Sequence, residues 1–126
     1  MVDVVKETLN VKINNESKFF TPKQRRASLI MVKKAMKDGV LSPLENVPCR
    51  MCGQTEGIKH YHCENYDDPV GDVSCLCWRC HMIFHSRYKS PEAVFRYIYE
   101  VTVYGKQYPP VYKHDFGILR TDYGIN

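Results

Sequence analysis

Two Cys-x-x-Cys pairs constrain this chain more than any other feature of its sequence. Cys49 and Cys52 form the first pair, and Cys77 and Cys80 form the second. Two residues between cysteines place both thiolates within reach of one ion, and zinc binds four such ligands in a tetrahedron. A site closed by four cysteines has no open position for a substrate. We therefore expect a structural zinc ion that holds residues 49–80 together.

The composition agrees with metal binding inside the cell. The chain has 126 residues, of which 44% are hydrophobic and 25% charged, as in ordinary soluble domains. No apolar run reaches the roughly 20 residues that span a membrane, and Met1 to Phe20 lacks the pattern of a signal peptide. We expect a cytoplasmic protein without a membrane partner. In a reducing compartment, paired cysteines indicate metal ligands instead of disulfides.

The hydrophobic pattern predicts an α+β fold. Thr21 followed by Pro22 marks the start of a helix that should end at Lys37. Further expected elements are strands at 58–63 and 73–76, helices at 78–88 and from 91 to about 105, an irregular or short-strand lead-in at 1–20, and an extended arm at 106–126. We divide this single compact domain into an N-terminal segment at 1–48, a zinc-stabilised core at 49–89, and a C-terminal helix with a tyrosine-rich arm at 90–126.

The first helix is basic along most of its length. Leu29, Val32 and Met36 recur at helical spacing and predict an apolar stripe. The charged positions are Lys23, Arg25, Arg26, Lys33, Lys34 and Lys37, and no acidic residue interrupts them. This surface is either a solvated face or a phosphate-binding face, and the sequence leaves both open.

Histidines follow the second cysteine pair at helical spacing. His81 directly follows Cys80, and His85 lies one turn later on the same helix face. Such a pair needs a further ligand to bind a metal, and His62 on the preceding strand is the candidate. The three could hold a divalent ion with open positions for water and a phosphate oxygen. Glu64 and Asn65 are ligands, orienting groups or water-positioning groups, or they belong to a solvated turn.

Three segments form a larger pattern, and they are Cys49-x-x-Cys52, His62-Cys63-Glu64-Asn65-Tyr66-x-x-Pro69, and Leu76-Cys77-x-x-Cys80-His81-x-x-x-His85. Together they resemble the HNH endonucleases of the ββα-metal fold. They are most similar to the small HNH proteins that are often encoded by phages, and the resemblance covers residues 49–87. It implies a ββα core with a structural zinc, and an endonuclease that hydrolyses DNA phosphodiester bonds with Mg²⁺ or another divalent ion.

The resemblance also implies roles for single residues. His81 matches the metal ligand on the helix, His85 the optional second ligand, and His62 the first histidine of the hairpin pair. Asn65 occupies the place of an aspartate, and Cys63 replaces the second histidine, which is the general base in this family. Three alternatives stay open. His62 is the base while the metal relies on the helix with Glu64 or Asn65, His60 on the same strand face is the base, or the site is impaired.

Basic residues near these motifs are expected to bind the scissile phosphate, and they are Arg50, Lys59, Arg79 and Arg87. DNA is the expected partner. Cutting both strands would favour a homodimer, and the C-terminal arm could bind another protein. Two other functions remain open. One is a zinc-knuckle protein that binds nucleic acid or regulates without cleaving, and the other is an inhibitor that binds an acidic protein.

Overall fold

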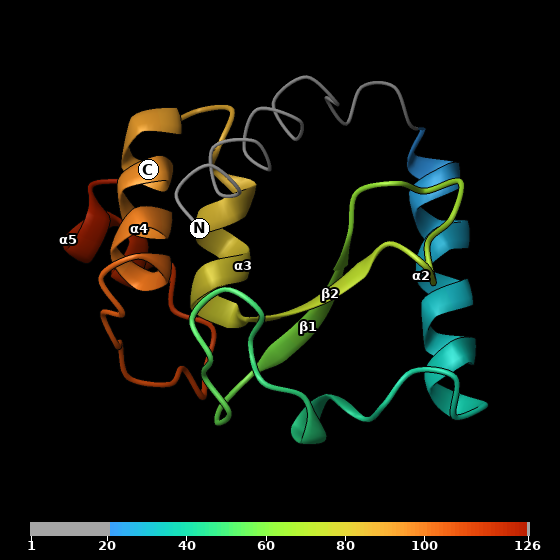
Figure 1. Cartoon of the computed structure of the whole chain (residues 1–126). Coiled ribbons are helices and arrows are strands. Elements are labelled where there is room, and N and C mark those ends of the chain that lie inside the picture. Colours follow the sequence, from blue (N-terminus) through green and yellow to red (C-terminus); the bar gives the residue numbers. More distant parts are fainter. Residues whose placement is uncertain (1–20, 126) are drawn as a thin grey trace.

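The described part of the chain, residues 21–125 of a computed structural model, has an α+β fold, as predicted. Residues 1–20 and 126 lie outside it, and so does the expected N-terminal lead-in. The elements are α2 (Pro22–Lys37), the 3₁₀ helix η2 (Leu44–Asn46), β1 (Lys59–Cys63), β2 (Val73–Cys77), α3 (Trp78–His85), α4 (Pro91–Thr102) and α5 (Gly117–Tyr123) (Figure 1). Within residues 21–125, none of the helices has the length and apolar character needed to cross a lipid bilayer.

The two strands form an antiparallel hairpin that sorts its side chains between two faces. Lys59 pairs with Cys77 at one end, and Cys63 pairs with Val73 at the other. Because side chains alternate along a strand, His60 and His62 share a face, and their rings lie against His81 of α3. The opposite face meets the loop before the hairpin, where the Tyr61 hydroxyl donates to the carbonyl of Ser42 at 2.5 Å. The hairpin thus turns its histidines toward α3.

Helix α3 follows β2 without a connecting loop. The Sγ atom of Cys77 caps the helix by accepting the backbone N–H of Cys80 at 3.5 Å. The helix ends at His85, earlier than the expected residue 88, because the Ser86 N–H donates to the Ile83 carbonyl and the Arg87 N–H to the Phe84 carbonyl. The chain then turns Arg87 into the interior, where it is 3% exposed.

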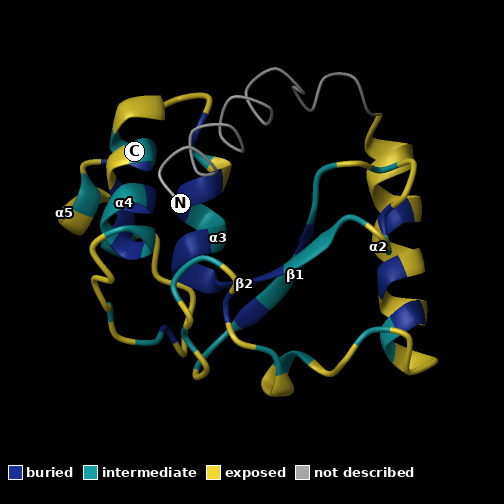
Figure 2. Ribbon diagram, in the orientation of Figure 1, coloured by how far each residue is buried: buried dark blue, intermediate teal, exposed yellow. Residues whose placement is uncertain are grey.

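Helix α2 has the predicted bounds, and Figure 1 shows the hairpin running between it and α3. A capping box fixes its start, because the Thr21 Oγ1 accepts the Gln24 N–H at 3.1 Å and the Gln24 Oε1 accepts the Thr21 N–H at 2.7 Å. The predicted apolar stripe is wrong at Leu29, which is 52% exposed. The buried side chains of this helix are Ser28, Val32 and Ala35 (Figure 2).

The core lies where α3, α4 and the C-terminal segment, residues 106–125, meet. Its most buried side chains are Trp78, Tyr97, Ile83, Ile125, Val94 and Cys80. The expected extended arm is irregular only in its first half, because residues 117–123 form α5. Leu119 and Ile125 are 7% and 1% exposed, so burial of these apolar side chains fixes the end of the chain on the core.

A close approach of the C-terminal segment makes Gly57 hard to replace. Gly57 has a φ of +80°, and a Cβ atom there would lie 2.6 Å from the Val111 carbonyl oxygen. Gly53 has a similar φ of +81° with nothing within 4 Å of a built Cβ, so it serves as the matched control. We expect Gly57→Ala to lower the free energy of unfolding by about 1–3 kcal/mol more than Gly53→Ala, from overpacking alone. Urea denaturation of the zinc-loaded proteins measures the difference, and equal losses would show that this contact is unimportant.

Candidate metal centres

The four cysteines meet at the junction of the hairpin and α3, and we call them the zinc site. Cys49 and Cys52 lie in a turn closed by the Gly53 N–H, which donates to the Cys49 carbonyl at 2.9 Å. Cys77 ends β2, and Cys80 lies in the first turn of α3. All four ligand atoms lie within 4.8 Å of one another, and the Sγ atoms of Cys52 and Cys77 are 3.8 Å apart. A zinc tetrahedron with bonds of about 2.3 Å has edges of about 3.8 Å, so the sulfurs fit this ion.

The protonation of these sulfurs also calls for a cation. Hydrogen bonds from the other three thiols hold the pKa of Cys49 far below its ordinary value. The pKa values of Cys77 and Cys80 are raised, because each donates to the Cys49 sulfur and is buried. Four sulfurs this close cannot all carry a negative charge unless a positive ion lies among them. Zinc removes this conflict by binding all four as thiolates.

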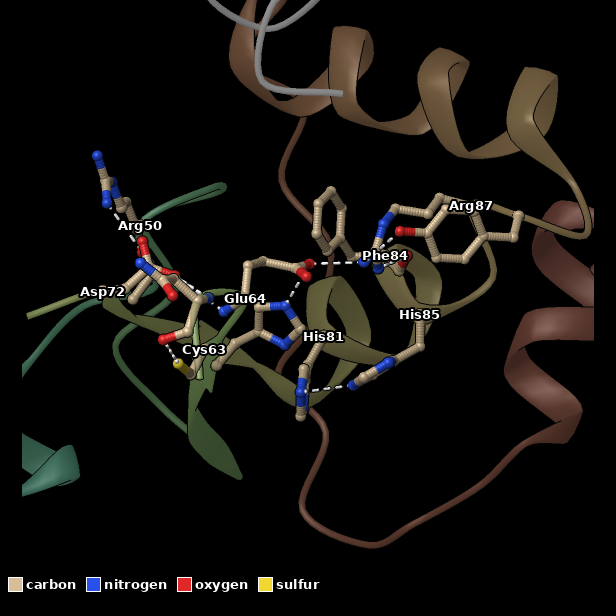
Figure 3. A network of polar contacts seen from close by, with 12 residues as sticks. Arg50, Cys63, Glu64, Asp72, His81, Phe84, His85 and Arg87 are labelled. Atoms are coloured by element: carbon tan, nitrogen blue, oxygen red, sulfur yellow. Dashed lines mark hydrogen bonds and ion pairs between the residues drawn. The ribbon is translucent and has the colours of Figure 1, made fainter. Parts of the chain in front are cut away.

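A second group of ligands, His62, His81 and His85, lies on the facing surfaces of β1 and α3, and we call it the histidine centre. One nitrogen of each ring lies within 4.8 Å of the others, and the Nε2 atoms of His81 and His85 are 3.0 Å apart (Figure 3). Burial, with help from the neighbouring imidazoles, lowers the pKa of His81 to about 3. Partial desolvation, His62 and Arg87 lower the pKa of His85 to about 4, although this residue is exposed. Both rings are therefore neutral at neutral pH, which is the form that binds metals. Three protein ligands leave a position open, as in catalytic sites.

A buried ion pair orients the first of these ligands. The Nε2 of His62 lies 2.9 Å from the Oε1 of Glu64, and the same oxygen accepts from the Nη2 of Arg87 at 2.6 Å. The side chains of His62, Glu64 and Arg87 are 9%, 12% and 4% exposed. We assign the His62 proton to Nε2 from this carboxylate partner, which leaves Nδ1 for a metal. Figure 3 shows Glu64 facing the guanidinium of Arg87.

His60 supports the second ligand in the same manner. Its Nδ1 lies 3.2 Å from the Nδ1 of His81. Burial and the nearby His114 lower the pKa of His60, so that it is a neutral acceptor. We therefore assign a proton to the Nδ1 of His81, which leaves its Nε2 free to bind an ion beside His85. In this arrangement His60 orients His81, because the Nδ1 of His60 accepts the hydrogen bond from the Nδ1 of His81.

The structure adds one histidine that the sequence did not single out. His114 belongs to the C-terminal segment, and its ring stacks on Trp78 at 5.8 Å with an interplanar angle of 20°. It also lies 6.3 Å from the ring of His60, so all five histidines of the chain gather in one cluster. Residues 106–126 have little periodicity, and no local pattern could have placed His114 here.

Two expected site residues have local partners at the end of the hairpin. The Oδ1 of Asn65 accepts the backbone N–H of Asp67 at 3.1 Å, an Asx turn, and the Asn65 N–H donates to Asp72 at 2.7 Å. The thiol of Cys63 donates to the Asn65 carbonyl at 3.2 Å. Cys63 contributes no atom to the histidine centre.

Of the four basic residues expected to bind phosphate, three are buried with structural partners. Arg79, on the side of α3 away from His81, donates to the Tyr123 hydroxyl at 3.0 Å and the Pro109 carbonyl at 3.3 Å. Lys59 donates to the Val47 carbonyl at 2.6 Å, and Arg87 holds Glu64. Only Arg50 is exposed, and its Nη1 donates to the Oγ of Ser74 at 2.8 Å.

Comparison of the chain with protein-family models, curated proteins and solved structures gave no match. An inference about function therefore depends on the chemistry of the two metal centres.

The Glu64 carboxylate should control metal affinity at the histidine centre. Glu64→Gln replaces an acceptor shared by His62 and Arg87 with an amide, so His62 loses its orienting partner and a buried guanidinium loses its counter-ion. We expect Ni²⁺ or Co²⁺ affinity at this centre to fall about 10–100-fold, with the cysteine-bound zinc retained. Glu56→Gln, an exposed loop change, is the control. Calorimetric titration of zinc-loaded protein measures the effect, and unchanged affinity would remove Glu64 from the site.

Proposed function

We propose that the protein is a metal-dependent endonuclease of the HNH type that hydrolyses phosphodiester bonds in DNA. One observation carries the proposal. His62, His81 and His85 converge beside a zinc site that is already complete, so they are not needed to close it. Their order, a strand histidine followed by a helical pair, and the consecutive strand, strand and helix that carry them support the ββα-metal interpretation.

The donor set indicates which ions the histidine centre would hold. Three imidazoles suit Zn²⁺, Ni²⁺ or Co²⁺, whereas Mg²⁺ prefers oxygen ligands and retains its waters. Of the divalent ions that the resemblance allows, Mg²⁺ or another, we therefore favour a transition metal. Such an ion, when bound, acts as a Lewis acid that stabilises charge on the phosphate and the leaving oxygen.

The chain's own groups position the ion and the substrate. Glu64 and Arg87 fix the His62 ring, and His60 fixes the His81 ring, so the open side of the centre is preorganised. Arg50 can bind a phosphate oxygen through guanidinium nitrogens other than the Nη1 that donates to Ser74. Its anchor, Ser74, pairs with His62 across the hairpin, which places the positive charge near the centre.

A second candidate function is nucleic-acid binding without cleavage on the same scaffold. It is favoured by Cys63, which stands where the related family has its general base and whose thiol is bonded to the Asn65 carbonyl. A thiol in that arrangement is a poor substitute for an imidazole that accepts a proton at neutral pH.

Cleavage and binding assays with one preparation distinguish these candidates. Zinc-loaded protein is incubated with supercoiled plasmid and with labelled single-stranded and duplex oligonucleotides, in the presence of Mg²⁺, Mn²⁺, Co²⁺, Ni²⁺ or Zn²⁺. Cleavage that requires an added ion is the expected result. DNA binding without cleavage under every ion would favour the second candidate. A chain that neither binds nor cuts DNA would contradict both and turn attention to a protein target.

A further inference from the structure

A hollow of about 590 Å³ lies on the C-terminal segment beside the histidine centre. It is lined by Arg79, Ile118 and residues 109–115. His114 belongs to this lining and is also the neighbour of His60, which bonds to His81. Two side chains in succession, His114 and His60, therefore link the lining of the hollow to the ligand His81.

Anchors on both sides hold the wall of the hollow in place. The Ile58 N–H donates to the Val111 carbonyl at 2.8 Å, which ties the wall to the residue before β1. Arg79, 6% exposed, donates to the Pro109 carbonyl from α3. The Gln54 Nε2 donates to the Tyr108 carbonyl at 3.2 Å from the turn that carries the first cysteine pair. The same elements that carry the two metal centres thus carry the hollow.

The lining combines flat apolar surface with charged groups of both signs. Pro109, Pro110 and Ile118 supply apolar walls, and the ring of Tyr112 is 70% exposed. Within residues 21–125, no carboxylate pairs with Lys113. Asp115 also lines the hollow, where its Oδ1 accepts the Gly117 N–H at 3.0 Å, and Asp122 lies 3.5 Å from Arg79.

The buried guanidinium at the wall is not fully bonded. The Nε of Arg79 has no hydrogen-bond partner among the described residues, although both Nη atoms are bonded. Asp122 compensates the charge of Arg79, so Lys113 is the cation of the lining that can meet a phosphate. Apolar walls, an exposed tyrosine and a lysine together match a nucleotide, whose base stacks on aromatic rings and whose phosphate binds lysine.

We propose that this hollow binds one unpaired nucleotide of the substrate, next to the phosphate held at the histidine centre. The proposal rests on the proposed function and deepens it by naming the substrate class, which is single-stranded DNA or DNA with a single-stranded branch or gap. A base enters a concave site only when it is unpaired, because in a duplex it is stacked and its edge is occupied. A volume near that of a small-ligand pocket admits one nucleotide and not a duplex.

The test measures binding and does not depend on cleavage. A short fluorescein-labelled single strand and its duplex are titrated by fluorescence anisotropy, with zinc-loaded protein and no other added metal. Tyr112→Ala is expected to weaken binding of the single strand about tenfold by loss of stacking. Lys113→Gln is expected to reduce the slope of log affinity against log salt by about 0.7 on the single strand. Both variants should change duplex binding less than about twofold, which is the usual deviation between sites that do not interact.

Lys106→Gln is the control, because Lys106 is an exposed lysine of the same segment that pairs with Glu100 outside the hollow. Single-strand binding by Tyr112→Ala and Lys113→Gln that equals that of Lys106→Gln would overturn the proposal. An equal loss for single strand and duplex would overturn it too. If the wild type cuts no DNA while these variants still lose single-strand binding selectively, the hollow stands and the hydrolysis proposal fails.

Discussion

Cys80→Ser is expected to yield a chain without a stable fold. Cys80 is 0% exposed and lies in the first turn of α3, between the zinc site and the core, where the hydroxyl of Tyr97 is 3.1 Å from its sulfur. Structural zinc contributes about 10–16 kcal/mol of apparent binding free energy in small domains. This exceeds or matches the whole stability of a typical domain, about 5–15 kcal/mol. Removing one ligand therefore removes most of what holds residues 49–85.

Cys75→Ser is the matched control for this change. Cys75 is also buried, at 4% exposure, but its Sγ lies 3.6 Å from the Val47 carbonyl and outside the zinc site. We expect it to lower stability by about 1 kcal/mol, as typical point changes do. Circular dichroism, thermal unfolding and zinc content of both variants check the prediction. A Cys80→Ser protein that unfolds cooperatively near the wild-type temperature would show that apolar packing suffices without the metal.

His81→Gln is expected to abolish cleavage while leaving the fold intact. His81 lies between the other members of the cluster, since its Nε2 faces His85 and its Nδ1 faces His60. Loss of a central ligand should empty the histidine centre, and we expect the cleavage rate to fall at least about a thousandfold, or about 4 kcal/mol of transition-state stabilisation. Cleavage of plasmid under the most active ion measures this loss.

Three controls separate chemistry from folding in that experiment. Zinc content should stay at the wild-type value, and so should the midpoint of thermal unfolding, because the imidazole is not a ligand of the zinc site. Lys89→Gln, an exposed change just beyond the end of α3, should cleave at the wild-type rate. If His81→Gln retains cleavage within a factor of about ten, the histidine centre does not catalyse the reaction, since loss of a catalytic metal ligand removes more than this.

Local patterns in the sequence predicted the elements that carry the two centres. The Thr21-Pro22 signal fixed the start of α2, and the approximate ranges of both strands agree with β1 and β2. The expectation that four cysteines come together is confirmed, because their ligand atoms lie within 4.8 Å. These features depend on spacing along a short stretch of chain, which the sequence displays directly.

Long-range partners could not be predicted in the same way. Arg79 and Arg87 looked like phosphate-binding residues because they are charged and close to the motifs, yet their partners are Tyr123 and Glu64. Which charges become buried depends on where the C-terminal segment and the hairpin end come to lie. Leu29 was placed in an apolar stripe by periodicity, but the buried face of α2 is centred on Val32. Periodicity predicts that a helix has an apolar stripe, but it does not tell which element of the fold covers that stripe.

The adjacency of Cys80 and His81 dictates an order of assembly. Their side chains leave one turn of α3 in two directions, the sulfur toward the zinc site and the imidazole toward β1. A helix of 8 residues does not persist alone in water, so we expect α3 to take its position only when the sulfurs have bound their ion. A newly made chain should then form its histidine centre only after zinc reaches the cysteines. The supply of one metal would decide when the site for the other comes into existence.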